Sequence, residues 1–303
     1  MDPKPSVDHL LDCLGELPPM PQVAQKALLL LRDPDSSMAQ LASVLAMDEA
    51  LAGLALRWAN SAYYGLKFPV STVQQAVTIL GQRVLHSLIL AASLATLLER
   101  PYPGYGLGRG DLWRHSLGVA AGARLVASSF GSQVAEEAYH AGLLCDIGKL
   151  AFEILLREVD LTAPEWQGQS FSDLEKAHFG VDHATLGAEM ARRWNLPSRL
   201  VEAIAYHHRP SEAGGSEAGG SEAGGSEAGG SEASGRVLAD AVHIADAAMM
   251  TLGVSIGYDG LQYAFDPKAC QRMGWNEARL GEFVNQIIPF IEETDRFIRL
   301  RRI

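Results

Sequence analysis

Apolar residues recur every three to four positions along most of the chain, a spacing typical of amphipathic helices. Residues 82–98 are so rich in Val, Leu and Ile that we expect this helix to be buried on more than one side. No pair of alternating apolar runs around a turn predicts a β-hairpin. We therefore expect an all-α fold, a helical bundle. The predicted helices cover residues 7–14, 22–31, 38–46, 49–60, 72–80, 82–98, 111–128, 134–156, 172–179, 198–208 and 236–252. Three further helices are predicted to begin at residues 183, 267 and 276.

Polar residues mark the starts of several of these helices. Ser37 with Gln40, and Ser172 with Glu175, have the form of a capping box. Asp182 is placed to cap the helix that follows it, which puts His183 in a first turn with its side chain directed into a site.

Two stretches of biased composition divide the chain. The Pro- and Gly-rich residues 101–110 predict a subdomain boundary, with an N-terminal helical subdomain at residues 1–105 packed on a second helical subdomain at 106–303. Residues 211–235 are near-perfect repeats of Ser-Glu-Ala-Gly-Gly. We expect this insertion to be a flexible coil that spans about 25–30 Å.

Charge and composition exclude several classes of function. The net charge of −11 argues against sequence-independent nucleic-acid binding, which depends on basic residues. The helices at 38–46 and 49–60 resemble a helix-turn-helix, but Arg57 is the only basic residue in the second, so core packing is favoured over DNA reading. The first residues lack the basic-then-apolar order of a signal peptide, and no apolar run reaches the length of a membrane-spanning helix. With three scattered cysteines, we expect a cytoplasmic protein with reduced thiols and no membrane contact.

Candidate chemistry centres on residues 140–149, where Asp146 and Lys149 lie in an otherwise apolar helical segment. A buried acid needs a partner. The candidate partners are histidines and a late aspartate, namely His115, His183, His207, His208 and Asp246. Imidazole and carboxylate groups in this number indicate a site for a divalent metal, either Fe, Mn, Zn or Mg, and the lysine is placed to meet an anion held there. The other histidines, His243 among them, are interpreted as surface or core residues.

The order of these residues resembles the ligand order of the HD superfamily of metal-dependent phosphohydrolases, and the whole chain resembles its HDOD branch (HD-related output domain) of bacterial signalling. The resemblance covers most of residues 15–210. Its motifs are Leu56-Arg-Trp-Ala-Asn-Ser-Ala-Tyr-Tyr-Gly65, Val70-Ser-Thr-Val-Gln-Gln-Ala-Val-Thr-Ile-Leu-Gly81, His115-Ser-Leu-Gly-Val-Ala120, Gly142-Leu-Leu-Cys-Asp-Ile-Gly-Lys149 and His178-Phe-Gly-Val-Asp-His-Ala-Thr-Leu-Gly187. The resemblance implies a helical bundle in which an N-terminal subdomain packs on an HD-like one.

The catalytic relatives are the HD-GYP phosphodiesterases of cyclic dinucleotides. A comparison with them implies roles for individual residues. The resemblance implies metal ligation by His115, Asp146, His183, His207, His208 and Asp246, with Asp111 at the place of a further acidic ligand and Lys149 at that of their lysine. Cys145 stands where the histidine of the His-Asp doublet is expected. The Gly-Tyr-Pro motif expected after the histidine pair is replaced by the repeats.

Two interpretations stay open. In the favoured one, the protein is a non-catalytic output module that acts through contacts with signalling proteins. Its polar cluster is then a degenerate site that binds one metal or only forms a hydrogen-bonded core, and its input is a partner or a small phosphate-containing ligand. In the alternative, it is a metal-dependent phosphohydrolase of a nucleotide or cyclic dinucleotide, with Asp146 and Lys149 as catalytic residues. A Cys145 thiolate is a conceivable extra ligand for a soft metal.

Overall fold

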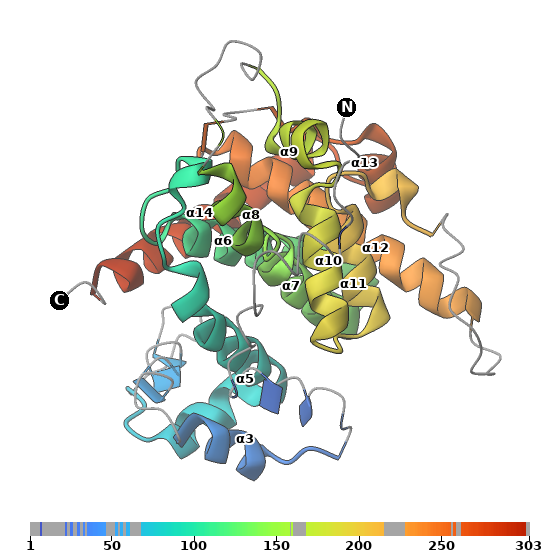
Figure 1. Ribbon diagram of the computed structural model, residues 1–303. Coiled ribbons are helices and arrows are strands. Elements are labelled where there is room, and N and C mark those ends of the chain that lie inside the picture. Colours follow the sequence, from blue (N-terminus) through green and yellow to red (C-terminus); the bar gives the residue numbers. More distant parts are fainter. Residues whose placement is uncertain are drawn as a thin grey trace. The chain divides into compact units, whose positions relative to one another are not determined.

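The regular secondary structure of the residues that the computed structural model describes consists of helices (Figure 1). The described residues are 68–157, 159, 168–214, 228–255, 257–258 and 262–300, with residues 7, 22, 25–26, 29–30, 33, 35–46, 52–53, 55–56 and 59–60 nearer the N-terminus. Among them there is no strand, and one isolated bridge joins Tyr102 to Leu107. The predicted all-α fold is confirmed. Every helix in these residues is too short or too polar to cross a bilayer.

The chain divides into two compact units, one formed by Pro18–Leu97 and the other by Leu98–Ile303 with Met1–Leu17. The first holds α3 (Met38–Ala46) and most of α5 (Val73–Leu98). The capping box of α3 is confirmed, since Ser37 N donates to Gln40 Oε1 at 2.6 Å and Gln40 N donates to Ser37 Oγ at 3.3 Å. Arg57 and most of the helices expected at 7–14, 22–31 and 49–60 lie outside the described residues. The subdomain of residues 1–105 stays a prediction.

Small residues bring together the central helices of the second unit, α6 (Asp111–Ala127), α7 (Ser132–Leu144) and α12 (Ala228–Thr251). A Cβ at Gly118 would lie 2.7 Å from Met249 Sδ, and one at Gly142 would lie 3.0 Å from Ala120 Cα. The bare glycines therefore allow the helix backbones to approach closely. Around this centre lie α8 (Lys149–Leu156), α9 (Phe171–Phe179), α10 (His183–Arg193), α11 (Ser198–Tyr206), α13 (Pro267–Met273) and α14 (Glu277–Leu300).

The single helix expected at 134–156 is wrong, because α7 ends at Leu144 and α8 begins at Lys149. The cause is tertiary. The turn between them packs against the start of α10 so closely that a Cβ at Gly148 would collide with the carbonyl oxygen of His183 and lie 2.7 Å from Gly187 N. The break lets Asp146 face α10.

The prediction of a flexible coil at residues 211–235 is wrong at both ends of this segment. Pro210–Glu212 forms a 3-10 turn, and α12 already begins at Ala228. The buried part of α12 supplies the helix nucleus, so the preceding residues need only extend it, although Gly229, Gly230 and Gly235 among them are poor helix formers. At the other end, the Arg236 guanidinium donates to Ala213 O. Residues 215–227 lie outside the described residues.

Candidate metal centre

The structure brings the six predicted ligand residues together from separate elements. His115 lies on α6, Asp146 in the turn after α7, His183 in the first turn of α10, and Asp246 on α12. His207 and His208 directly follow α11. Ligand atoms of Asp146, His183, His207 and His208 all lie within 4.8 Å of one another.

Asp146 is at the centre of this cluster. Its Oδ1 is 3.3 Å from His183 Nε2 and 3.9 Å from His207 Nε2. Its Oδ2 is 2.9 Å from Lys149 Nζ and 3.6 Å from His115 Nε2. Burial opposes ionisation, but Lys149 and His183 outweigh it and hold the Asp146 pKa well below its usual value. The carboxylate is therefore ionised, which is the form that binds a cation.

His115 and Asp246 form a second pair beside it. His115 Nε2 lies 2.9 Å from Asp246 Oδ1, and His115 Nδ1 lies 3.3 Å from Val254 O. Burial lowers the His115 pKa, but the Asp246 carboxylate outweighs this and the net shift is upward. The other oxygen, Asp246 Oδ2, is 3.6 Å from His208 Nδ1, which connects this pair to the four-residue group.

The histidine pair after α11 is held in the neutral form. Burial lowers the His207 pKa, and burial together with the neighbouring His207 and His183 lowers the His208 pKa further. His207 Nδ1 donates to Ile204 O at 2.7 Å, and its buried Nε2 has no hydrogen-bond partner. An unpartnered imidazole nitrogen 3.9 Å from a carboxylate oxygen fits a metal ligand. The donor set of three imidazoles and a carboxylate suits a divalent transition metal.

Cys145 lies in a different environment from its neighbour Asp146. Its thiol donates to Gly142 O at 3.2 Å, and it belongs to the apolar core with Ala138, Ala141 and Ala203. Burial raises the Cys145 pKa well above its usual value, so the thiol stays protonated. The geometry does not support Cys145 as a ligand. The Asp111 carboxylate makes a local hydrogen bond, since its Oδ2 accepts from Gly108 N at 2.8 Å.

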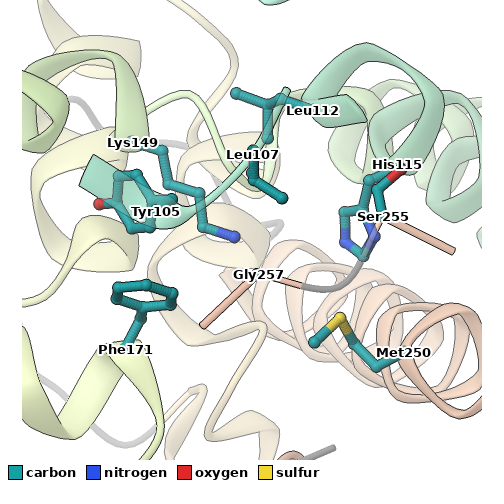
Figure 2. Close-up of a pocket in the computed structure, with 9 residues that line it drawn as sticks. All are labelled: Tyr105, Leu107, Leu112, His115, Lys149, Phe171, Met250, Ser255 and Gly257. Carbon is teal, nitrogen blue, oxygen red and sulfur yellow. The ribbon is translucent and has the colours of Figure 1, made fainter. Parts of the chain in front are cut away.

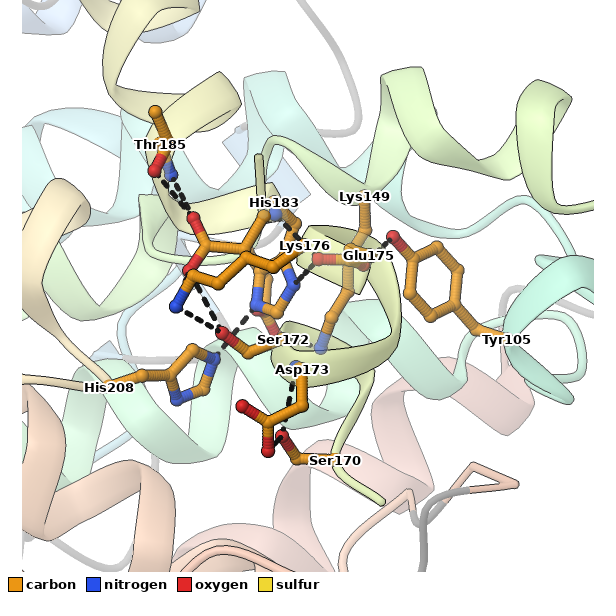
Figure 3. A network of polar contacts seen from close by, with 12 residues as sticks. Tyr105, Lys149, Ser170, Ser172, Asp173, Glu175, Lys176, His183, Thr185 and His208 are labelled. Atoms are coloured by element: carbon orange, nitrogen blue, oxygen red, sulfur yellow. Dashed lines mark hydrogen bonds and ion pairs between the residues drawn. The ribbon is translucent and has the colours of Figure 1, made fainter. Parts of the chain in front are cut away.

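Glu175 is a functional candidate that the sequence reasoning missed. The predicted capping box is wrong, because Ser170 caps α9 by accepting from Asp173 N at 3.2 Å. Glu175 instead accepts from the backbone N–H of His183 at 2.6 Å, from its Nδ1 at 2.7 Å and from the Tyr105 hydroxyl at 2.6 Å (Figure 3). The available signal was its position on the apolar face of its helix, four residues after Phe171.

Electrostatics support the interaction between Glu175 and His183. Burial lowers the His183 pKa, but Glu175 outweighs it and the pKa is raised to about 10. The expected cap at Asp182 is confirmed, since its carboxylate accepts from Thr185 N at 2.9 Å. His183 is therefore fixed by its helix start and by Glu175 together.

A small cavity of about 20 Å³ adjoins the cluster. The Lys149 ammonium and the His115 ring point into it, and the Lys149 Nζ lies 5.7 Å from the Tyr105 ring centroid (Figure 2). A volume of this size holds about one water molecule. The remaining lining residues are Leu107, Leu112, Phe171, Met250, Ser255 and Gly257.

The described residues form an all-α fold with a buried cluster of histidines and aspartates. The chain belongs to the HDOD family, because the HDOD domain model matches residues 17–210. A curated relative from Treponema pallidum (strain Nichols), named an uncharacterized protein, is 25% identical over 203 residues, which is 66% of this chain and 39% of the relative. The chain thus spans about two-fifths of the length of the curated relative it matches.

Two solved structures share the fold. A protein from Marinobacter aquaeolei VT8 with the provisional name signal transduction protein is similar at a TM-score of 0.68 and 22% identity, over 95% of this chain and 60% of that one. A protein from Shewanella amazonensis SB2B with the provisional name metal-dependent phosphohydrolase is similar at a TM-score of 0.55 and 19% identity, over 88% of this chain and 86% of that one. At these identities the likeness establishes the fold alone.

Proposed function

We propose that the protein is a cytoplasmic output module of bacterial signal transduction that acts through contacts with partner proteins and does not hydrolyse a nucleotide. The observation that carries this proposal is the cavity at Lys149, whose volume is about 20 Å³. A cavity of this size holds about one water molecule beside the cluster, which favours a role other than nucleotide hydrolysis.

The same site is proposed to hold a divalent metal with a structural role. Asp146, His183, His207 and His208 would supply four donors, which is the number that fills a closed zinc site; with His115 and Asp246 the set reaches six, which suits iron or manganese. Magnesium prefers oxygen ligands and fits less well. When bound, the metal would supply positive charge that ties α10 and α12 to the turn after α7.

Metal analysis of the purified chain tests this proposal, with Asp146→Ala as the matched variant. We expect about one equivalent of transition metal in the wild type and a large loss in the variant. If neither protein contains metal, the proposed metal site is wrong. The absence of catalysis is tested separately on a panel of phosphodiesters, nucleotides and cyclic dinucleotides, with no metal-dependent turnover expected.

A metal-dependent phosphohydrolase is the second candidate, and one observation favours it. All six residues that match ligands of catalytic relatives converge, and Lys149 lies 2.9 Å from the central Asp146. In this case Asp146 would hold the metal and Lys149 would bind a phosphate of a nucleotide or cyclic dinucleotide. Turnover that requires metal and disappears in both His183→Ala and Asp246→Ala would establish this function and overturn the non-catalytic one.

A further inference from the structure

His183 is held by one carboxylate from two directions. Glu175 Oε2 accepts from the backbone N–H of His183 at 2.6 Å and from its ring Nδ1 at 2.7 Å. Both side chains are fully buried. Since Nδ1 faces an acceptor, it carries the hydrogen in the neutral ring, and Nε2 is the nitrogen available to a metal. Nε2 points to the centre of the cluster, 3.3 Å from Asp146 Oδ1 and 2.9 Å from His208 Nε2.

The other oxygen of Glu175 is bound to the cavity wall. Tyr105 donates its hydroxyl to Glu175 Oε1 at 2.6 Å, and its ring packs against Phe171 at a centroid distance of 4.6 Å. Burial and Glu175 raise the Tyr105 pKa well above its usual value, so the phenol remains a donor. The three hydrogen bonds from Tyr105 and His183 fix the carboxylate in one orientation (Figure 3).

A buried carboxylate is stable only with a compensating positive charge close by. Here the facing group is the imidazole of His183, whose Nδ1–H donates to Glu175 at 2.7 Å. A metal held on Nε2 would supply positive charge on the other side of the ring, and the hydrogen would remain on Nδ1. The negative charge of Glu175 then makes the imidazole a stronger donor to the metal.

We propose that Glu175 is a positioning residue of the metal centre, which fixes the ring of His183 with Nε2 toward the metal and strengthens that bond through its charge. This inference rests on the proposed metal site. Removal of such an outer partner typically weakens metal binding by about 10- to 100-fold.

Glu175→Gln removes the negative charge of this side chain and keeps its size and shape. Its amide oxygen can accept both hydrogen bonds from His183, and its NH₂ group can donate to the Tyr105 oxygen. The matched control is Glu153→Gln, the same change at a buried glutamate that accepts from Gly104 N at 3.0 Å and from Arg157 at 2.8 Å. Tyr105→Phe removes one hydrogen bond to Glu175 and leaves its charge.

The experiment measures the dissociation constants for Zn²⁺ and Co²⁺ by chelator competition on the full chain. The absorption spectrum of the Co²⁺ form and the Tm of metal-free protein are recorded in parallel. We expect Glu175→Gln to weaken both metals by about 10-fold or more and to change the Co²⁺ spectrum. The metal-free Tm of each variant separates a loss of affinity from a loss of stability. We expect Glu153→Gln to keep wild-type affinity.

The possible failures are distinguishable. Metal binding by wild type with equal affinity in Glu175→Gln overturns the role of Glu175 and leaves the metal site standing. Absence of binding in wild type overturns both. If Glu175→Gln does not fold, Tyr105→Phe decides the matter: a several-fold loss of affinity supports the inference, and wild-type affinity overturns it.

Discussion

Cys145 and Asp146 are adjacent, yet their side chains lie in opposite environments. Asp146 reaches four charged or imidazole groups, whereas Cys145 belongs to the apolar core and donates its thiol to Gly142 O. Successive residues on a helical turn point about 100° apart, which is enough to send one into the core and the other into the cluster. The core position therefore suits a small, weakly polar side chain.

Cys145→His is expected to destabilise the protein without adding a metal ligand. The larger polar ring overfills the core, at a cost of about 1–3 kcal/mol for the volume alone. Denaturant unfolding of metal-free protein, together with metal stoichiometry, checks this, and Cys145→Ser serves as a size control. A variant that binds more metal, or binds it more tightly, would refute the assignment of Cys145 to the core.

His183 gives the metal-free protein a specific pH dependence. Its pKa is raised from 6.5 to about 10, because Glu175 outweighs the effect of burial. A raised pKa stabilises the fold fully below about 6.5, and this stabilisation is lost as the pH rises through 10.

We therefore expect the free energy of unfolding of chelator-treated wild type to fall between pH 7 and pH 10, and to fall less in His183→Gln. Denaturant titrations at several pH values measure both slopes. Equal slopes in the two proteins would show that His183 is not the titrating group.

At the scale of helices, periodicity and caps were sufficient to predict α3, α6 and α10, because those signals are local. The break between α7 and α8 has no local signal: it depends on Gly148 meeting the first turn of α10, which is distant in sequence. The same distinction applies to the site. The resemblance supplied the six candidate ligand residues, but the core position of Cys145 and the bond between Glu175 and His183 depend on tertiary packing.

Gly148→Ala tests the close contact between the turn and α10. The added Cβ would collide with His183 O, so we expect the turn to move and the protein to lose about 1–3 kcal/mol of stability, with weaker metal binding. Gly281→Ala on α14 is the matched control. It also replaces a glycine by alanine, but inside a helix and at a position where the added Cβ has no atom within 4 Å. A Gly148→Ala protein as stable as wild type would contradict the packing described.

At the scale of the second unit, the proposed metal would connect α6, α10, α12 and the segment after α11. Binding to the folded form alone stabilises it by about 2.7 kcal/mol at a metal concentration 100 times the dissociation constant. For a unit of roughly 200 residues this corresponds to a rise in Tm of roughly 5–10 °C.

We expect metal to raise the Tm by that amount in wild type and to have little effect in Asp146→Ala. Differential scanning calorimetry with Zn²⁺ or with a chelator gives the comparison. A similar rise in both proteins would indicate binding elsewhere on the chain.

The convergence of distant residues also has a consequence for biosynthesis. His115 and Asp246 are separated by 131 positions in the sequence. A ribosome adds about 5–20 residues per second, so the first ligand is made on the order of ten seconds before the last. The complete set of donors exists only once α12 has been translated. At the proposed centre, a metal could therefore be held by the full set of donors only after α12 has been translated.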